Sequence, residues 1–123
     1  MKDYQMGVIE SRFADLIWEN EPISSSELAR RSEALFKWKK STTYTVLKRL
    51  CEKGIFRNSH GTVSSLVSRQ EFYALQTERF VEQTFDGSLP HFLAAFSRRK
   101  KLSDKEILEL KKLIDTYEEE NHD

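Results

Sequence analysis

Apolar residues recur at helical spacing through the first half of the chain, and helix-breaking residues separate the runs. In the first run they follow the i, i+4, i+7, i+8 spacing of one helix face, at Ile9, Phe13, Leu16 and Ile17. This spacing predicts a helix over residues 8–19, which Pro22 ends and in which Trp18 helps to cover the core. A second helix should begin at Ser24, because Ser24 and Glu27 form the S-x-x-E pattern of a capping box. One side of this helix carries Leu28, Ser32 and Leu35.

The third run is a short helix whose two sides differ in chemistry. After a loop over residues 36–40, Ser41 can cap a helix over residues 42–53, and Gly54 can end it in a left-handed conformation. Because a helix turns about 100° per residue, Val46, Leu47 and Leu50 lie on one side. The other side carries hydroxyls and cations, at Ser41, Thr42, Thr45, Lys48 and Arg49. Such side chains suit the major groove of DNA, and the alternative is a helix whose charged side is merely solvated.

A β-hairpin should follow this helix. Residues 55–57 suggest a short strand, residues 58–61 a turn, and residues 62–67, rich in Val, Thr and Ser, a returning strand. Two helices joined by a short connection, a first helix that supports them and a hairpin form a winged helix-turn-helix domain. His60 in the turn can approach DNA from this wing, or it is simply an exposed turn residue.

Three more helices are predicted in the second half of the chain. Capping-box patterns at Ser68 and at Ser103 begin helices that run to about Phe85 and to the end of the chain. Between them, Asp86-Gly87-Ser88 stops one helix, a shorter helix covers residues 89–97, and residues 98–101 form a basic linker. The fold class is therefore mainly α with a small β-hairpin.

The second half has more apolar helix surface than a monomer of this size buries easily. We expect a winged-helix DNA-binding domain over residues 1–67 and a helical dimerisation domain over residues 68–123. The alternative is that the terminal helix folds back on its own chain. The predicted dimerisation residues are Phe80, Phe85, Phe92, Phe96, Ile107, Leu110, Ile114 and Tyr117.

Composition favours a folded, non-membrane protein. The 123 residues suit one domain, or a small domain with a helical segment, and 11% aromatic residues argue against disorder. No apolar run is long enough to span a bilayer, and the N-terminal residues, Met1 to Tyr4, lack the apolar core of a signal peptide. We therefore expect a cytoplasmic protein with no membrane insertion.

Charge is balanced over the chain but unevenly distributed. The formal net charge is zero, yet residues 1–67 have a net charge of +3 and residues 68–123 one of −3. Residues 30–57 contain nine Lys and Arg against two Glu, a net charge of +7 around the third helix. Such a concentration supplies the attraction to phosphate that DNA binding needs.

Candidate catalytic and metal chemistry is sparse. The three histidines, His60, His91 and His122, are scattered, and no metal-ligand spacing, glycine-rich phosphate loop or nucleophile motif is present. The single cysteine, Cys51, lies at the edge of an apolar helix side and is either a packed thiol or a reactive one. We expect no enzyme activity, no cofactor and no bound metal.

Six segments in a fixed order resemble one known family. They are Trp18 near the end of the first helix; P-I-S-S-S-E-L at 22–28; Trp38 followed by T-x-x-T-V-L-x-R-L-x-x-K-G at 42–54; L-V-S-R-Q-E-F at 66–72; F-D-G-S at 85–88; and L-S-D-K-E-I-L-E-L-K-K-L-I-D at 102–115. From about Ile9 to Glu120 the chain resembles the penicillinase repressor group of bacterial transcriptional regulators, which includes BlaI, MecI and CopY. The resemblance implies a homodimeric repressor that binds a palindromic double-stranded DNA operator and controls antibiotic-resistance or stress-response genes.

The resemblance also assigns roles to particular residues. The positions expected to contact DNA are Ser41, Thr42, Thr45 and Arg49, to which charge and geometry add Lys39, Lys40 and Lys48. In the beta-lactam branch a membrane sensor protease cleaves the repressor ahead of a phenylalanine, and that bond aligns with Ala95-Phe96, where the cleaved members have Asn in place of Ala95. The copper-responsive branch ends in a cysteine cluster, whereas this chain has no cysteine after Cys51.

One feature of the wing keeps a second function open. Residues 58–67 contain no Lys or Arg, so the wing lacks the cations that would hold phosphate. The alternative function is therefore a winged-helix protein-interaction module, or anti-regulator, that no longer binds DNA.

Overall fold

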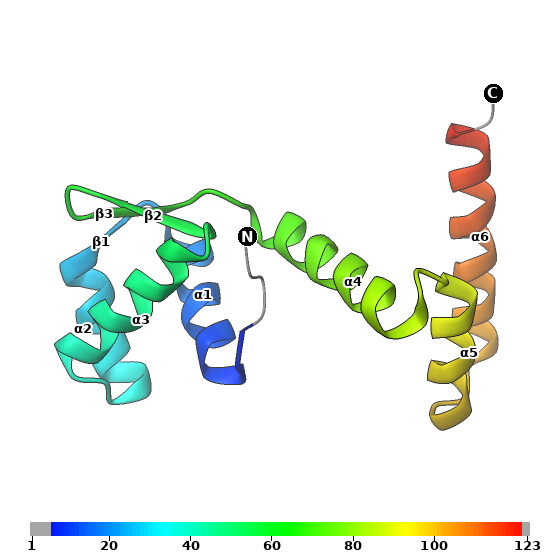
Figure 1. The fold of residues 1–123 in the computed structure, drawn as a ribbon, viewed down its shortest axis with the longest axis horizontal. Coiled ribbons are helices and arrows are strands. Elements are labelled where there is room, and N and C mark those ends of the chain that lie inside the picture. Colours follow the sequence, from blue (N-terminus) through cyan, green and yellow to red (C-terminus); the bar gives the residue numbers. More distant parts are fainter. Residues whose placement is uncertain (1–5, 122–123) are drawn as a thin grey trace. The chain divides into compact units, whose positions relative to one another are not determined.

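The computed structural model describes residues 6–121 (Figure 1), and the chain has two compact units, Met1–Phe80 and Val81–Asp123. The stretch Met1 to Tyr4 and His122 lie outside the described residues. The chain is mostly helical with one small antiparallel sheet, which confirms the predicted fold class. No helix within residues 6–121 is long and apolar enough to cross a membrane.

The first unit contains three complete helices, three short strands and the beginning of a fourth helix. These elements are α1 (Val8–Asn20), β1 (Ile23–Ser24), α2 (Ser25–Phe36), α3 (Lys40–Glu52), β2 (Phe56–Ser59), β3 (Thr62–Ser65) and α4 (Arg69–Phe85). Their order confirms the predicted arrangement of three helices followed by a hairpin.

The sheet has the strand order β1-β3-β2, with both pairs antiparallel. β1 was not predicted, because two residues after a proline show no strand periodicity; it pairs Ile23 with Val63. The hairpin loop is tighter than expected: His60 (φ +52°) and Gly61 (φ +86°) alone connect β2 to β3. Positive φ at both loop residues is the geometry that matches strand twist, and the Asn58 side chain accepts a hydrogen bond from the Gly61 amide at 3.0 Å.

A single apolar core joins the helices of the first unit to its sheet. Its fully buried large side chains include Phe13, Ile17, Leu28, Leu50, Phe56 and Phe72. Trp18 covers this core as predicted: its ring centroid lies 5.2 Å from that of Phe56, and its indole N–H donates to the carbonyl of Val67 at 3.0 Å. Phe72 belongs to α4, so the first turn of α4 is part of this core.

The start of α3 differs from the prediction. The helix begins at Lys40, and Lys39, not Ser41, is the N-cap; the Lys39 carbonyl accepts hydrogen bonds from the amides of Thr42 and Thr43. The reason is a compact turn in which Lys37 adopts a left-handed conformation (φ +59°) and Trp38 packs against Phe36 and Phe13. At the other end Gly54 is left-handed (φ +83°), as predicted.

The side of α2 that carries Leu28, Ser32 and Leu35 is only partly buried. Leu28 and Ser32 are buried, but Leu35 is 62% exposed, because Phe36 takes the next inward position and packs against the core. In α1, Ile9 is likewise 47% exposed, since that helix packs mainly through its later turns.

The second unit consists of the end of α4, α5 (Leu89–Arg99) and α6 (Asp104–Glu120). Asp86 and Gly87 both have positive φ and end α4 as predicted. Ser103 and Glu106 form a complete capping box, whereas at Ser24 and Ser68 only the serine hydroxyl bonds to the helix amide. α5 extends through Arg99, so part of the predicted basic linker is helical.

Candidate nucleic-acid interface

The two sides of α3 have the contrasting environments that the sequence predicts. Val46, Leu47 and Leu50 are buried in the core, together with Thr43. All seven predicted DNA-contacting residues are exposed: Lys39, Lys40, Ser41, Thr42, Thr45, Lys48 and Arg49. Because the buried side chains fix the rotation of the helix, the hydroxyls and cations are presented to solvent from a rigid element.

The start of α3 is held by contacts with its own residues and with α2. The Thr45 hydroxyl donates to the carbonyl of Ser41 at 2.9 Å, which leaves the hydroxyl oxygen able to accept a hydrogen bond. Tyr44 donates to the Ser25 hydroxyl at 3.5 Å, and the Lys40 ammonium lies 5.8 Å from the centroid of the Tyr44 ring. These contacts position the first turn of α3 relative to the N-terminus of α2.

Arg49 has a partner that the sequence did not indicate. Its Nη1 lies 3.6 Å from Oε2 of Glu10 in the first turn of α1. The Arg49 side chain is 51% exposed and that of Glu10 is 21% exposed. The two residues are 39 positions apart, so no local pattern links them.

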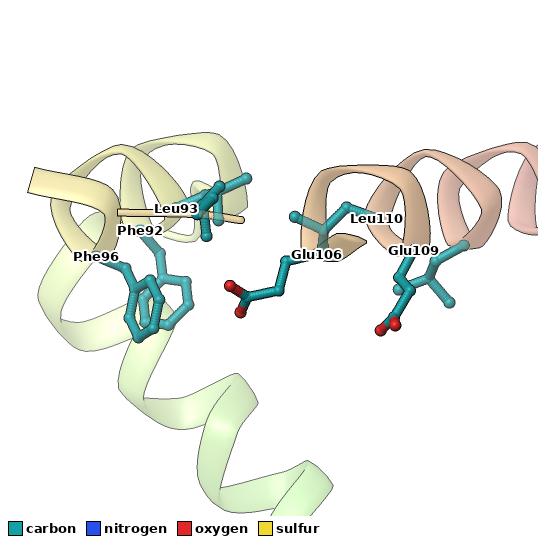
Figure 2. A pocket seen from close by; sticks show the side chains of 8 residues that line it. Phe92, Leu93, Phe96, Glu106, Glu109 and Leu110 are labelled. Atoms are coloured by element: carbon teal, nitrogen blue, oxygen red, sulfur yellow. The ribbon is translucent and has the colours of Figure 1, made fainter. Parts of the chain in front are cut away.

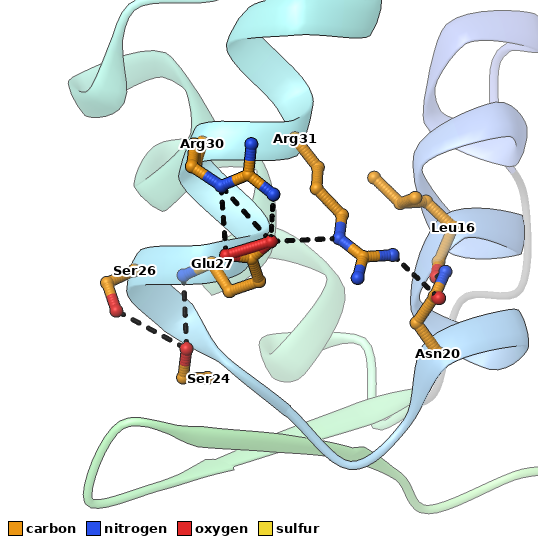
Figure 3. Close-up of polar contacts among 7 residues, drawn as sticks. All are labelled: Leu16, Asn20, Ser24, Ser26, Glu27, Arg30 and Arg31. Carbon is orange, nitrogen blue, oxygen red and sulfur yellow. Dashed lines mark hydrogen bonds and ion pairs between the residues drawn. The ribbon is translucent and has the colours of Figure 1, made fainter.

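Two further basic residues of the 30–57 window, Arg30 and Arg31 of α2, contact a carboxylate (Figure 3). Arg30 donates through Nε to both Glu27 oxygens, and Arg31 donates through Nε to Glu27 and through Nη1 to Asn20 at 2.7 Å. These hydrogen bonds, first from Arg30 and then from Arg31, lower the pKa of Glu27 to about 2. The depressed pKa means that the pairing is fully present above the ordinary carboxyl pKa and is lost as the pH falls toward 2. Glu27, which lies outside the +7 window, thus compensates part of the positive charge of Arg30 and Arg31.

The wing offers polar atoms and little charge. Arg57 is exposed in β2, and beyond it the hairpin displays Asn58, Ser59 and His60. The Ser59 hydroxyl lies 3.5 Å from Nδ1 of His60, and His60 is exposed at the loop. His60 is thus accessible, and its role in DNA contact stays a prediction.

Cys51 is half-buried beside the core. Burial raises the pKa of its thiol, so the nucleophilic thiolate is disfavoured at neutral pH. This environment favours the packed thiol over the reactive one. Within the described range 6–121, no cluster of three or more His, Cys, Asp or Glu side chains could hold a metal ion.

The second unit has an open apolar groove between α5 and α6, with a volume of about 450 Å³ (Figure 2). Three of the predicted dimerisation residues, Phe92, Phe96 and Leu110, line it. Three further apolar residues line the groove and were not among the predicted dimerisation residues: Leu93, Leu102 and Leu113. Leu93 lies next to Phe92 on α5 and Leu113 follows Leu110 by three residues on α6, whereas Leu102 precedes α6 and has no helical spacing that could predict it.

The remaining predicted dimerisation residues do not line this groove. Ile107, Ile114 and Tyr117 are exposed along α6, and Phe80 is 49% exposed on α4. Phe85 packs edge-on against His91 and Phe92, with centroid distances of 5.4 and 5.7 Å. The Ala95-Phe96 bond lies inside α5, so a protease that binds extended substrate would need α5 to unwind locally.

Comparisons with known proteins agree with the resemblance found in the sequence. Residues 6–116 match the family described as penicillinase repressor. The chain is 22% identical to the penicillinase repressor of Bacillus licheniformis over 117 residues, which cover 92% of this chain and 91% of that protein. It is 23% identical to the methicillin resistance regulatory protein MecI of Staphylococcus aureus and of Staphylococcus epidermidis, again over 92% of this chain and 95% of each relative. The match extends through both compact units, and the chain belongs to the penicillinase repressor family, whose members are transcriptional regulators and not enzymes.

Proposed function

We propose that this protein is a homodimeric repressor that places α3 of each subunit in successive major grooves of a palindromic operator. One observation supports this most: the exposed side of α3 combines hydroxyls with cations, while its other side is fixed in the core. A helix of this kind between a supporting helix and a hairpin is the geometry with which winged helix-turn-helix proteins bind DNA.

The side chains on α3 suit two kinds of DNA contact. Lys39, Lys40 and Lys48 supply charge for phosphates, which positions the helix on the duplex. Ser41, Thr42 and Thr45 can bond to phosphates or to base edges, and Arg49 can bond to guanine through a pair of parallel hydrogen bonds. The wing contributes little to phosphate binding because residues 58–67 lack cations.

The exposed apolar side chains of the second unit favour a dimer. Among its described residues, 81–121, only Val81 is buried, and neither α5 nor α6 has a buried residue. Large apolar side chains left exposed on a small helical unit indicate a partner surface. A second copy of the chain satisfies this requirement with two-fold symmetry, which a palindromic operator shares.

The relatives suggest which genes are controlled and how control is released. Their names refer to penicillinase and to methicillin resistance, so we infer that the target genes are resistance genes or stress-response genes. A membrane sensor protease that cleaves Ala95-Phe96 is the corresponding release mechanism. The site of action is the cytoplasm, where the operator DNA is located.

Replacing Arg49 with Ala tests the contact with bases. We expect binding to the preferred duplex to weaken by about 1–3 kcal/mol, with a smaller loss on random DNA, because a paired contact to guanine discriminates between bases. Filter binding or fluorescence anisotropy on both duplexes measures the two losses.

The matched control is Arg57→Ala, which removes an exposed arginine from β2 instead of α3. A phosphate contact there would weaken binding equally on both duplexes. If Arg49→Ala also gave equal losses on both, Arg49 would have no part in base recognition.

A further inference from the structure

The Glu10–Arg49 ion pair joins the first turn of α1 to the exposed side of α3. Both residues lie close to the core along their helices: Phe13 and Ala14, one turn after Glu10, are fully buried, and so is Leu50, next to Arg49. An ion pair between two such positions holds the guanidinium in one region of space, although its side chain is half exposed.

The burial of the Glu10 carboxylate favours its contact with Arg49. Its Oε2 is inaccessible to solvent and has no hydrogen-bond partner among the described residues, so the guanidinium 3.6 Å away is the charge that compensates it. A buried carboxylate oxygen without such compensation is costly, which favours conformations in which Arg49 stays near Glu10.

The geometry at Arg49 leaves the guanidinium able to bind a second acceptor. The contact with Glu10 uses Nη1, while Nε and Nη2 form the adjacent edge of the planar group. That edge can donate a pair of parallel hydrogen bonds, the arrangement used for O6 and N7 of guanine.

We propose that Glu10 is a positioning residue for sequence discrimination: it holds Arg49 through Nη1 so that the Nε–Nη2 edge faces a guanine. This inference rests on the proposed DNA-binding function. Glu10 also compensates part of the charge of Arg49, which weakens the attraction of Arg49 to backbone phosphates whatever the DNA sequence. Glu10 therefore raises affinity for the preferred site and lowers it for other DNA.

The substitution Glu10→Gln tests this proposal, because we expect opposite changes in affinity for two DNA duplexes. One probe is the duplex that the wild-type protein selects from a random-sequence library, and the other is unselected random duplex. Affinity for the selected duplex should fall by about tenfold, as a partial loss of one paired base contact. Affinity for random duplex should rise, and its log–log salt slope should steepen by up to about 0.9 because Arg49 becomes available to one more phosphate.

Two controls separate positioning from stability and from net charge. Glu52→Gln makes the same charge change in the last turn of α3 and should not reduce discrimination. In an Arg49→Ala background, Glu10→Gln should change discrimination by less than about twofold, because its effect acts through Arg49. Circular dichroism checks that the variants are folded, and the salt slope is a readout that a purely structural role would not alter.

Each alternative outcome is decisive. Equal changes on both duplexes, an effect matched by Glu52→Gln, or an undiminished effect without Arg49 would each overturn the positioning role while leaving the proposed function intact. A wild-type protein that selects no duplex would overturn the proposed function and this inference with it.

Discussion

Replacing Ile114 with Glu should convert the protein to a monomer and reduce its affinity for the selected duplex by about a hundredfold to ten-thousandfold. Ile114 is 60% exposed on α6, so the substitution removes little from the subunit itself. In the proposed dimer it would bury a charge in an apolar interface. Once one subunit of the dimer is bound to DNA, the second binds as an intramolecular event, which raises the affinity for DNA about 10²- to 10⁴-fold. A monomer lacks this gain in affinity.

Light scattering and DNA binding measure the two parts of this prediction separately. The wild-type protein should have twice the 14.5 kDa mass of one chain, and the variant should have the mass of one chain. Thr116→Glu is the matched control, because it introduces the same charge at an exposed polar position of α6. A dimer that persists in the Ile114 variant, or that is lost equally with Thr116→Glu, would refute the placement of the interface.

Replacing Phe72 with Ala should lower the free energy of unfolding of the first unit by about 3–5 kcal/mol. The Phe72 ring is fully buried, and its centroid lies 5.6 Å from that of Trp18. The loss is a large part of the stability of a small domain, about 5–15 kcal/mol. The fluorescence of Trp18 and Trp38, the two tryptophans of the chain, reports unfolding of this unit specifically.

Phe80→Ala provides the control, since it removes the same side chain from the same helix where the ring is 49% exposed. The free energy reported by tryptophan should then change by less than about 1 kcal/mol. Equal losses for the two variants would mean that the beginning of α4 has no special role in the core. A larger loss for Phe72→Ala than for Phe80→Ala would instead show that the first turns of α4 fold together with the core that holds α3.

The predictable part of the fold depended on patterns that are local in the sequence. The apolar spacing of α1 and α3 identified Phe13, Ile17, Leu47 and Leu50 as core residues, because a helix with one apolar side must bury it. Gly54 was identifiable as a helix end because few residues other than glycine adopt positive φ readily.

The features that escaped prediction depend on tertiary contacts. Ser41 is a good capping residue by type, yet the packing of Trp38 against Phe13 starts α3 earlier, at Lys40. One further difference is local: the carboxylate of Glu27 pairs with Arg30 and Arg31, three and four residues along α2, instead of completing a capping box.

The same distinction applies to the candidate site. One helical projection identifies five of the seven exposed residues, Ser41, Thr42, Thr45, Lys48 and Arg49, and the local charge adds Lys39 and Lys40. The partner of Arg49 comes from α1, and only the packed arrangement of the two helices brings Glu10 within 3.6 Å. A net-charge count over residues 30–57 cannot include such a carboxylate from outside the window.

The salt dependence of DNA affinity tests the central claim, that α3 and its surroundings bind an operator, most directly. For the dimer, log affinity for the selected duplex should fall linearly with log salt, and about six to ten phosphate contacts would cost about 10³- to 10⁵-fold between 50 and 200 mM. The selected duplex should remain at least about 10³-fold tighter than random duplex at each salt concentration. The absence of measurable DNA affinity even at low salt would contradict the claim and favour the protein-interaction module.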